Sequence, residues 1–579
     1  MSLSNTISHA YKQFKYPFLV FILICIKLVY MHYSVVSDKG ELTRFAYIEN
    51  IGTTLIDAGI ILFFLFLLTS KKKYFYILSF ILIDIFVLTN IWYSRNFHSY
   101  FPLSLYFEFN NLQGLTNNIL ASTRWKDTII PITSIFAIRL IYHKLYSYNS
   151  FKYRRQIAFT FLGSSLILIG IFFSMVFLRS SSLKEKFILP YAYNPMESTF
   201  RHGSLYYFFI QIWNSESQQY SKEELKELES LFFTSETTIQ TNPFNKNIII
   251  IIVESLLSFA DELSFSGQAI TPYLNQIKKE NTYYNHHVIP QTQLGESSDG
   301  QFIYLTGLLP LKNSVTIVNH LKNQFISLSS LLKEQNKITE SRMTIPTGPT
   351  FWRQDKICSN YQIDSLFTRN EYSQKREMWL NDEQIFDLAK SKDINTTQPF
   401  LSVILTSSTH SPYNQAIDNY ITFDFPSDYS NELKNYLINL HYADKQIGNY
   451  IQFLKENDLY SNSIIIIVSD HEAHDSYLNL PLTLKHITKE IPLYIINPPA
   501  KIVRPSNDTI TQSDIFPTLL DLTGIQSSWR GVGRSLLLPD SLANTPRELT
   551  RREKAQEISE IIIHSDYFKS HSIPTVSPR

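Results

Sequence analysis

Hydrophobic and polar positions follow two different patterns along the chain. Residues 1–180 contain long apolar runs of membrane-spanning length, separated by short polar connections. These runs predict five transmembrane helices, near residues 17–36, 50–69, 74–93, 128–143 and 157–178. The fourth run is the shortest and contains Pro131 and Arg139. We therefore expect the chain to begin with an α-helical membrane bundle of five helices.

Beyond residue 246 the apolar runs become shorter and richer in β-branched residues. NIIIIIV (247–253), FLSVIL (400–405) and SIIIIVS (463–469) are typical of strands that are buried on both faces of a parallel sheet. Amphipathic helical stretches such as residues 432–457 separate these runs. The alternation predicts a doubly wound α/β domain over residues 247–540.

Two further segments complete the expected organisation. Residues 181–246 read as a linker with one helical segment, for which Ser221 is the predicted N-cap and Glu224 completes a capping box. Residues 541–579 contain a charged helix followed by a polar tail, which we expect to be disordered.

The charges of the connections predict the orientation of the bundle. The N-terminal arm and the connections at residues 70–73 and 144–156 are basic and contain no acid. By the positive-inside rule the N-terminus lies in the cytoplasm, and five spans place everything after about residue 179 outside. The first span is too long for a cleavable signal peptide and is followed by further spans.

Composition excludes one class of partner and one kind of cross-link. The net charge is +1 and there is no long basic tract, so nothing indicates nucleic-acid binding. The only two cysteines, Cys25 and Cys358, lie in different predicted domains, which argues against an intramolecular disulfide.

Ionisable residues also occur within the predicted spans. They are Lys27, Asp57, Asp84 and Arg139. Charged groups are costly in hydrocarbon and are often functional there. Pairing inside the bundle, or a lysine whose ammonium reaches the interface, is the alternative interpretation.

Polar side chains of metal-binding type directly follow two of the predicted strands. Glu254 follows NIIIIIV, and Asp470 and His471 follow SIIIIVS. Because the carboxyl ends of parallel strands meet at one edge of a sheet, we expect these side chains to share one divalent cation. One imidazole with oxygen ligands suits Mn²⁺ or Zn²⁺. The alternative is a carboxylate at Glu254 that caps the next helix.

A serine pair in the turn GESSDG is the candidate nucleophile. Ser297 and Ser298 compete for the role, and no G-x-S-x-G motif surrounds them. A serine hydroxyl needs activation, which coordination to a cation would supply. A plain helix cap is the alternative role for this pair, although Asp299 is the better cap candidate.

Other candidates surround the predicted substrate pocket. His410, in THSPY, follows the strand FLSVIL and could contact substrate or protonate a leaving group. Trp352 and Arg353, in TFWRQD, offer an aromatic wall and a cation for a phosphate. The alternative is that His410 is an ordinary loop histidine, Trp352 a core tryptophan and Arg353 a surface arginine. Glu472, His474 and His486 could supply further ligands or could be structural.

Several motifs, in order and spacing, resemble a known family. NIIIIIVES, TPYLNQI, GESSDGQF, FW, THSPY, SDH, IPLYIINPP, DIFPTLLDLTGI and GRSLL follow the predicted five-span region. The set resembles the lipoteichoic acid synthase and phosphoglycerol transferase group of the alkaline phosphatase and sulfatase superfamily. The resemblance implies an extracytoplasmic sulfatase-like catalytic domain on a multi-pass protein of a bacterial cell membrane.

The resemblance also implies roles for individual residues. Glu254, Ser297, Asp470 and His471 correspond to the family's metal ligands, with Ser297 in the place of a nucleophile that is usually threonine. His410 and Trp352 correspond to substrate-contacting residues.

Two departures from the family pattern concern the substrate pocket. The family's arginine stands two residues after its tryptophan, where this chain has Gln354 and places Arg353 one position early. A pocket histidine upstream of the tryptophan has no counterpart. Both departures concern the transferred group and leave the reaction type unaffected.

The resemblance implies a two-step transfer. A phosphoglycerol-type group moves from a membrane phospholipid, phosphatidylglycerol, to Ser297 and then to a glycan or glycolipid acceptor. A phosphoethanolamine transferase is the nearest alternative, although those enzymes usually carry several disulfides in the outer domain. A phosphodiesterase also remains open, while a sulfatase is disfavoured because the C-x-P-S-R element is absent. A non-catalytic membrane scaffold is the third class.

Overall fold

The structure is a computed structural model, and it falls into two compact units. One unit comprises residues 1–103 and 119–216, and the other comprises residues 104–118 and 217–579. The domain boundaries expected from the sequence stay predictions. The structure describes residues 3–37, 44–68, 74–97, 100–101, 103–107, 120, 122–142, 154–179, 199, 203–213, 220–233, 244–312, 314–349, 351–372, 379–396, 399–411, 413, 421–472, 478, 480–481, 484, 489–503 and 509–570.

The first unit is a bundle of long apolar helices. They are α1 (Leu3–Ser37), α2 (Arg44–Leu68), α3 (Tyr74–Phe97), α5 (Ile129–Leu140), α6 (Arg154–Arg179) and α9 (Ser204–Trp213), with a short 3-10 turn η3 (Trp125–Thr128) before α5. Within the described residues, three segments are long and apolar enough to cross a membrane: Phe14–Val35, Ile51–Leu68 and Tyr74–Arg95. Helices also occur at the fourth and fifth predicted positions, but the count of five spans stays a prediction. At about 1.5 Å per residue, the 12 residues of α5 reach only about 18 Å.

Ionisable side chains of the bundle are paired in the interior. The Lys27 ammonium donates hydrogen bonds to the Asp84 carboxylate and to Ser134 Oγ. Asp57 accepts from the backbone N–H and the hydroxyl of Ser204, both at 2.7 Å, at the first residue of α9. These contacts favour the structural interpretation for Lys27, Asp57 and Asp84, because each of these side chains has a hydrogen-bond partner within the bundle. Arg139 is exposed.

The second unit is built on an eight-stranded mixed sheet in the order β10-β4-β9-β8-β1-β7-β5-β6. Strands β8, β1, β7, β5 and β6 are parallel to one another, whereas β9 is antiparallel to both β8 and β4. The bounds are β1 (Asn247–Val253), β4 (Thr282–Ile289), β5 (Glu340–Thr344), β6 (Ser365–Phe367), β7 (Phe400–Leu405), β8 (Ser463–Ser469), β9 (Ile491–Ile496) and β10 (Ile510–Thr511). A small hairpin joins β2 (Ser264–Phe265) and β3 (Gln268–Ala269).

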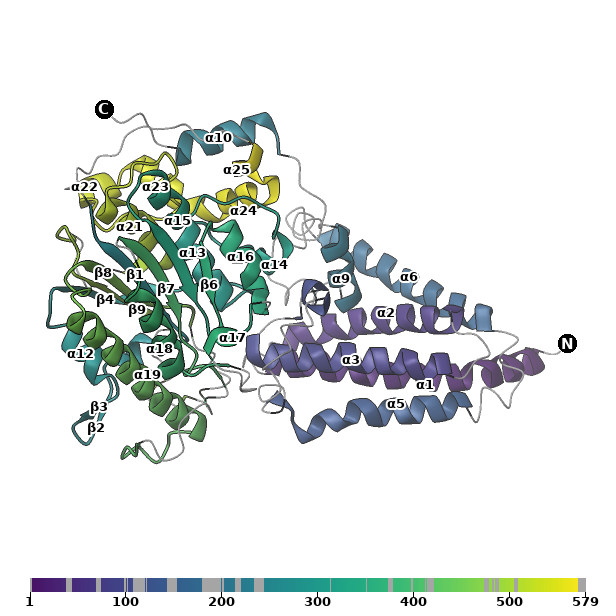
Figure 1. Cartoon of the computed structure of the whole chain (residues 1–579). Coiled ribbons are helices and arrows are strands. Elements are labelled where there is room, and N and C mark those ends of the chain that lie inside the picture. The colour runs from purple at the N-terminus through teal and green to yellow at the C-terminus, as the bar shows by residue number, and fades with distance from the viewer. Residues whose placement is uncertain are drawn as a thin grey trace. The chain divides into compact units, whose positions relative to one another are not determined.

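Helices cover both faces of this sheet (Figure 1). One face carries α12 (Pro272–Ile277), α18 (Asp382–Asp393) and α19 (Asn431–Glu456). The other carries α13 (Ser297–Thr306), α15 (Leu328–Glu334) and α21 (Ile515–Thr523). Because both faces are covered, every residue of β1, β7 and β8 is buried. The α/β class expected from the sequence is confirmed.

Shorter elements complete the second unit. They are residues 104–107 of η1 (Leu103–Phe107), α10 (Lys222–Phe232), α11 (Ser258–Asp261), α14 (Thr316–Asn319), η7 (Phe351–Arg353), α16 (Gln354–Asn360), α17 (Arg369–Tyr372), η8 (Gln512–Asp514), α22 (Asp540–Ala543), α23 (Pro546–Glu553), α24 (Ala555–Ser565) and α25 (Tyr567–Ser570). The predicted capping box of α10 is confirmed, since Ser221 Oγ accepts from Glu224 N–H and Glu224 accepts from Ser221 N–H. Ile558, Ile562 and Ile563 of α24 belong to the same core as the sheet.

Candidate active site

The strand register brings three potential metal ligands together. Val253 is paired with Ser469 across β1 and β8, so the next residues, Glu254 and Asp470, leave the sheet side by side. Carboxylate oxygens of both and an imidazole nitrogen of His471 lie within 4.8 Å of one another. His471 Nε2 is 3.4 Å from Glu254 Oε1 and 3.5 Å from Asp470 Oδ2. The donors have the type and spacing to hold a divalent cation.

Backbone contacts orient these ligands. Asp470 Oδ1 accepts from the N–H groups of Ser255 and His471, both at 2.8 Å. His471 Nδ1 lies 2.7 Å from the carbonyl oxygen of Glu472, which can only accept, so Nδ1 carries a proton and Nε2 faces Glu254 and Asp470. Glu472 therefore contributes its backbone carbonyl, while its side chain lies 3.5 Å from Lys489 Nζ. His474 and His486 lie outside the described residues.

The electrostatics of the cluster favour a bound cation. Burial and the neighbouring Glu254 carboxylate raise the pKa of Asp470 to about 7, and burial raises the pKa of Glu296 to about 8. Burial disfavours the charged forms of Glu254 and His471 as well. Even so, the neighbouring imidazoles of His410 and His471 hold the pKa of Glu254 below its usual range. The nearby carboxylates, of which Asp470 has the largest effect, raise the pKa of His471 well above its usual value. A divalent cation would relieve the repulsion between these carboxylates.

The two candidate serines have different surroundings. Ser297, the first residue of α13, donates from its hydroxyl to Glu254 Oε2 at 3.3 Å. Ser298 is almost fully buried and donates to the carbonyl oxygen of Gly295 at 2.5 Å. Ser297 is thus the serine that contacts the Glu254, Asp470 and His471 cluster, and Ser298 stabilises the turn before it.

Asp299 and two glycines fix the position of this turn. Asp299 Oδ2 accepts from the N–H groups of Gln293 and Gly295, both at 2.9 Å, so Asp299 supports the turn before α13 instead of capping the helix itself. A Cβ on Gly295 would meet Asp299 Oδ1 at 2.2 Å, and a Cβ on Gly300 would meet the Asp470 carbonyl oxygen at 2.3 Å. Helix α13 therefore packs directly against the end of β8.

A buried polar network that the sequence did not indicate supports Asp470 from behind. Tyr304 donates from its hydroxyl to the Ser469 carbonyl oxygen at 2.5 Å. Gln512 Nε2 lies 2.9 Å from both the Tyr304 hydroxyl oxygen and the Asp470 carbonyl oxygen. These residues come from α13 and η8, which are distant in sequence from β8, so no local pattern could have found them.

A chain of aromatic rings leads from the predicted pocket residues to His410. The Trp379 ring meets the His410 ring edge to face at 4.5 Å, and Phe351 lies 5.4 Å from Trp379 and 6.2 Å from Trp352. His410 Nδ1 is 2.6 Å from the Ser411 carbonyl oxygen, which leaves Nε2 for another partner. Among the described residues, the buried Nε1 of Trp379 has no hydrogen-bond partner. Trp379 is a candidate pocket residue that sequence reasoning missed.

The segment in which the sequence departs from the family pattern is strained. Trp352 and Arg353 both have left-handed backbones, with φ of 48° and 53°, which is uncommon for residues other than glycine and typical of functional sites. Arg353 Nε lies 3.9 Å from Asp355 Oδ1. Gln354 is buried, and its amide nitrogen donates to Gln301 Oε1 of α13 at 3.1 Å. Gln354 therefore supports α13, the helix that begins at Ser297.

Comparisons with known proteins cover both units. Residues 1–222 match the family model of the Lipoteichoic acid synthase N-terminal domain, and residues 246–525 match that of Sulfatase. Lipoteichoic acid synthase-like YvgJ of Bacillus subtilis (strain 168) is 27% identical over 299 residues, which is 49% of this chain and 48% of the relative. This chain thus matches about half the length of that relative.

A longer match and a solved structure extend the comparison. Lipoteichoic acid synthase of Staphylococcus saprophyticus is 23% identical over 518 residues, covering 83% of this chain and 78% of the relative. The structure of lipooligosaccharide phosphoethanolamine transferase A from Neisseria meningitidis, an integral membrane protein, has a TM-score of 0.53 and 12% identity. It covers 88% of this chain and 96% of its own, and at this identity the likeness concerns the fold alone.

Proposed function

Since the chain belongs to the lipoteichoic acid synthase family of the alkaline phosphatase and sulfatase superfamily, we propose that it is a membrane-bound, metal-dependent phosphoglycerol transferase. The donor is a membrane phospholipid, phosphatidylglycerol, and the acceptor is a hydroxyl of a glycan or glycolipid. The observation that carries the proposal is the 3.3 Å contact between Ser297 Oγ and Glu254 Oε2 inside the Glu254, Asp470 and His471 cluster.

Glu254, Asp470, His471 and Ser297 would hold the cation, which is Mn²⁺ or Zn²⁺ given one imidazole among oxygen ligands. When bound, a divalent cation lowers the pKa of a hydroxyl and offsets negative charge on a phosphoryl group. The protein's own part is to fix the Ser297 oxygen at the first turn of α13, whose N-terminal amides favour an anionic group.

The first step forms a glycerophosphoserine, a phosphodiester in which the phosphorus keeps its glycerol. The Ser297 oxygen bonds to the phosphorus of the donor as the bond to the diacylglycerol oxygen breaks, and the serine proton passes to water. His410 Nε2 supplies a proton to the departing diacylglycerol oxygen. In the second step the acceptor hydroxyl returns a proton to His410 and bonds to phosphorus, and the Ser297 oxygen leaves and regains a proton from water.

The decisive experiment measures diacylglycerol release. Membranes containing the protein are incubated with labelled phosphatidylglycerol and, separately, with labelled phosphatidylethanolamine, with Mn²⁺ or Zn²⁺ supplied. Release from phosphatidylglycerol is expected. Release from phosphatidylethanolamine alone would instead identify a phosphoethanolamine transferase, and release from neither lipid would refute transfer from a phospholipid.

A serine pair provides the matched control. Ser297→Ala should lower release by at least about a thousandfold, because the attacking oxygen is lost. Ser298→Ala removes one neutral hydrogen bond, worth about 1 kcal/mol, and should stay within about fivefold of the wild type. If Ser297→Ala kept its activity, the assignment of the nucleophile would be wrong.

For location, we propose a multi-pass protein of the bacterial cell membrane with the catalytic unit outside the cytoplasm. The support is the three apolar helices and the basic connections between the predicted spans. A reporter fused after residue 179 that is active only in the cytoplasm would contradict this topology.

A further inference from the structure

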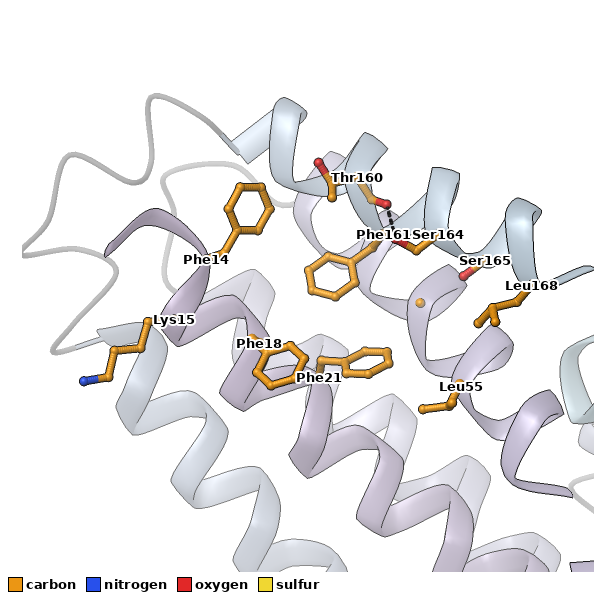
Figure 2. Close-up of a pocket in the computed structure, with 11 residues that line it drawn as sticks. Phe14, Lys15, Phe18, Phe21, Leu55, Thr160, Phe161, Ser164, Ser165 and Leu168 are labelled. Carbon is orange, nitrogen blue, oxygen red and sulfur yellow. Dashed lines mark hydrogen bonds between the residues drawn. The ribbon is translucent and has the colours of Figure 1, made fainter. Parts of the chain in front are cut away.

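An apolar groove lies within the helical bundle, between α1, α2 and α6. Its cavity has a volume of about 430 Å³, within the usual range of ligand pockets. Figure 2 shows the rings of Phe14, Phe18 and Phe21 from α1 on one side and Phe161 of α6 on the other. The Phe21 and Phe161 rings stack at 5.3 Å.

The groove continues along α1 for most of the thickness of a membrane. A second cavity of about 510 Å³ shares Phe18, Phe21 and Leu55 with the first and extends along α1 to Tyr33. From Phe14 to Tyr33 the helix rises about 28 Å, close to the ~30 Å thickness of the hydrocarbon core of a bilayer.

The hydroxyls that line the groove are already bonded. Thr160 Oγ1 donates to the Gln156 carbonyl oxygen at 2.8 Å, Ser164 Oγ donates to that of Thr160 at 2.9 Å, and Ser165 Oγ donates to that of Ile56 at 3.2 Å. These small side chains hollow the wall of α6 without offering a free donor to a ligand. The groove is therefore suited to an alkyl chain.

One end of the groove is strongly basic. Lys15 is exposed, and in Figure 2 its side chain extends away from the rings at the end marked by Phe14. Arg154 and Arg155 open α6 about 9 Å before Thr160, the first residue of α6 in the lining. Residues 1–37 and 143–160 contain no aspartate or glutamate to neutralise these cations.

We propose that this groove binds an anionic glycerophospholipid of the leaflet at the Lys15 end. One acyl chain lies among the phenylalanine rings, and the phosphate lies near Lys15 and Arg155. Any lipid would contact the apolar wall, but only an anionic head group complements the basic end. The site is made wholly from the helical bundle and is independent of the chemistry proposed for Ser297.

The test counts the lipid molecules that remain on the purified full-length chain, by native mass spectrometry, with phosphatidylglycerol or phosphatidylcholine added. The wild type should retain phosphatidylglycerol in preference. Ser164→Phe fills the groove and should lose it. Ser79→Phe is the matched control, because Ser79 also bonds back to the carbonyl of its own helix, at 2.8 Å, but lies on α3 away from the groove.

A charge variant keeps the test decisive if Ser164→Phe fails to fold. Lys15→Gln combined with Arg155→Gln alters exposed side chains only, and should weaken phosphatidylglycerol retention by about fivefold for each charge removed while leaving phosphatidylcholine unchanged. The proposal is overturned if the wild type retains both lipids equally, if a folded Ser164→Phe variant retains phosphatidylglycerol as Ser79→Phe does, or if the charge variant retains it as the wild type does.

Discussion

Removing the Tyr304 hydroxyl should weaken metal binding without touching a metal ligand. Tyr304→Phe deletes the donor to the Ser469 carbonyl oxygen and one partner of Gln512 Nε2. Losing a buried neutral hydrogen bond costs about 1 kcal/mol on average, and about 1–3 kcal/mol where the partner carbonyl is left unsatisfied. If the loss of this hydrogen bond weakens cation binding at Asp470 by about 2 kcal/mol, the affinity for the cation drops roughly thirtyfold. This agrees with the 10- to 100-fold losses typical of residues that support metal ligands.

The assay titrates a chelator-stripped protein with Mn²⁺ and follows diacylglycerol release from phosphatidylglycerol. Tyr304→Phe should need roughly thirtyfold more metal for half-maximal activity, while kcat at saturating metal stays near the wild-type value. Tyr361→Phe is the control, because the buried Tyr361 hydroxyl has no hydrogen-bond partner among the described residues. An unchanged metal requirement in Tyr304→Phe would refute the reasoning that this hydroxyl supports Asp470.

Three further outcomes are expected. Stripping the protein with EDTA should abolish diacylglycerol release, and Mn²⁺ or Zn²⁺ should restore it; activity that survives complete stripping would contradict the metal centre. Trp379→Phe keeps a ring against His410 but removes the buried N–H, so KM for the donor should rise up to about tenfold with little change in kcat, and an unchanged KM would remove Trp379 from the pocket. Gln354→Arg should destabilise the catalytic unit by about 3 kcal/mol, because it places a charge in the buried contact with Gln301; the melting temperature should fall far more than in Arg353→Gln, and equal melting temperatures would contradict this.

A site residue could be predicted from the sequence where the residues next to it form a recognisable pattern. The isoleucine runs before Glu254 and Asp470 were enough to predict two buried parallel strands and a shared edge. A strand that is buried on both faces appears in the sequence as a continuous run of apolar residues. The same kind of pattern could not decide which of Ser297 and Ser298 is the nucleophile candidate, since both lie in the same turn after Gly295. Only the structure shows that Ser297 contacts Glu254. The family resemblance chose between them, and the geometry agrees with that choice.

The residues that could not be predicted from the sequence were missed for one shared reason. Tyr304, Gln512 and Trp379 act through contacts with segments far along the chain, and nothing in their own neighbourhoods differs from ordinary core or loop positions. The departure at Gln354 was visible in the sequence, but its meaning was not. The structure shows its amide bonded to Gln301 on α13.

The pairing of β1 with β8 has a consequence for how the catalytic unit is held together outside the cell. Ser255 and Asp470 lie 215 residues apart in sequence, yet their strands meet at the cation cluster. The second unit contains one cysteine, Cys358, and so cannot form an internal disulfide across this span. A cation held by Glu254 and Asp470 would be a reversible cross-link between the two ends of this long segment. At a cation concentration 100 times its Kd it would add about 2.7 kcal/mol to the free energy of unfolding. The concentration of the cation in the surroundings would then affect the stability of the folded catalytic unit as well as its activity.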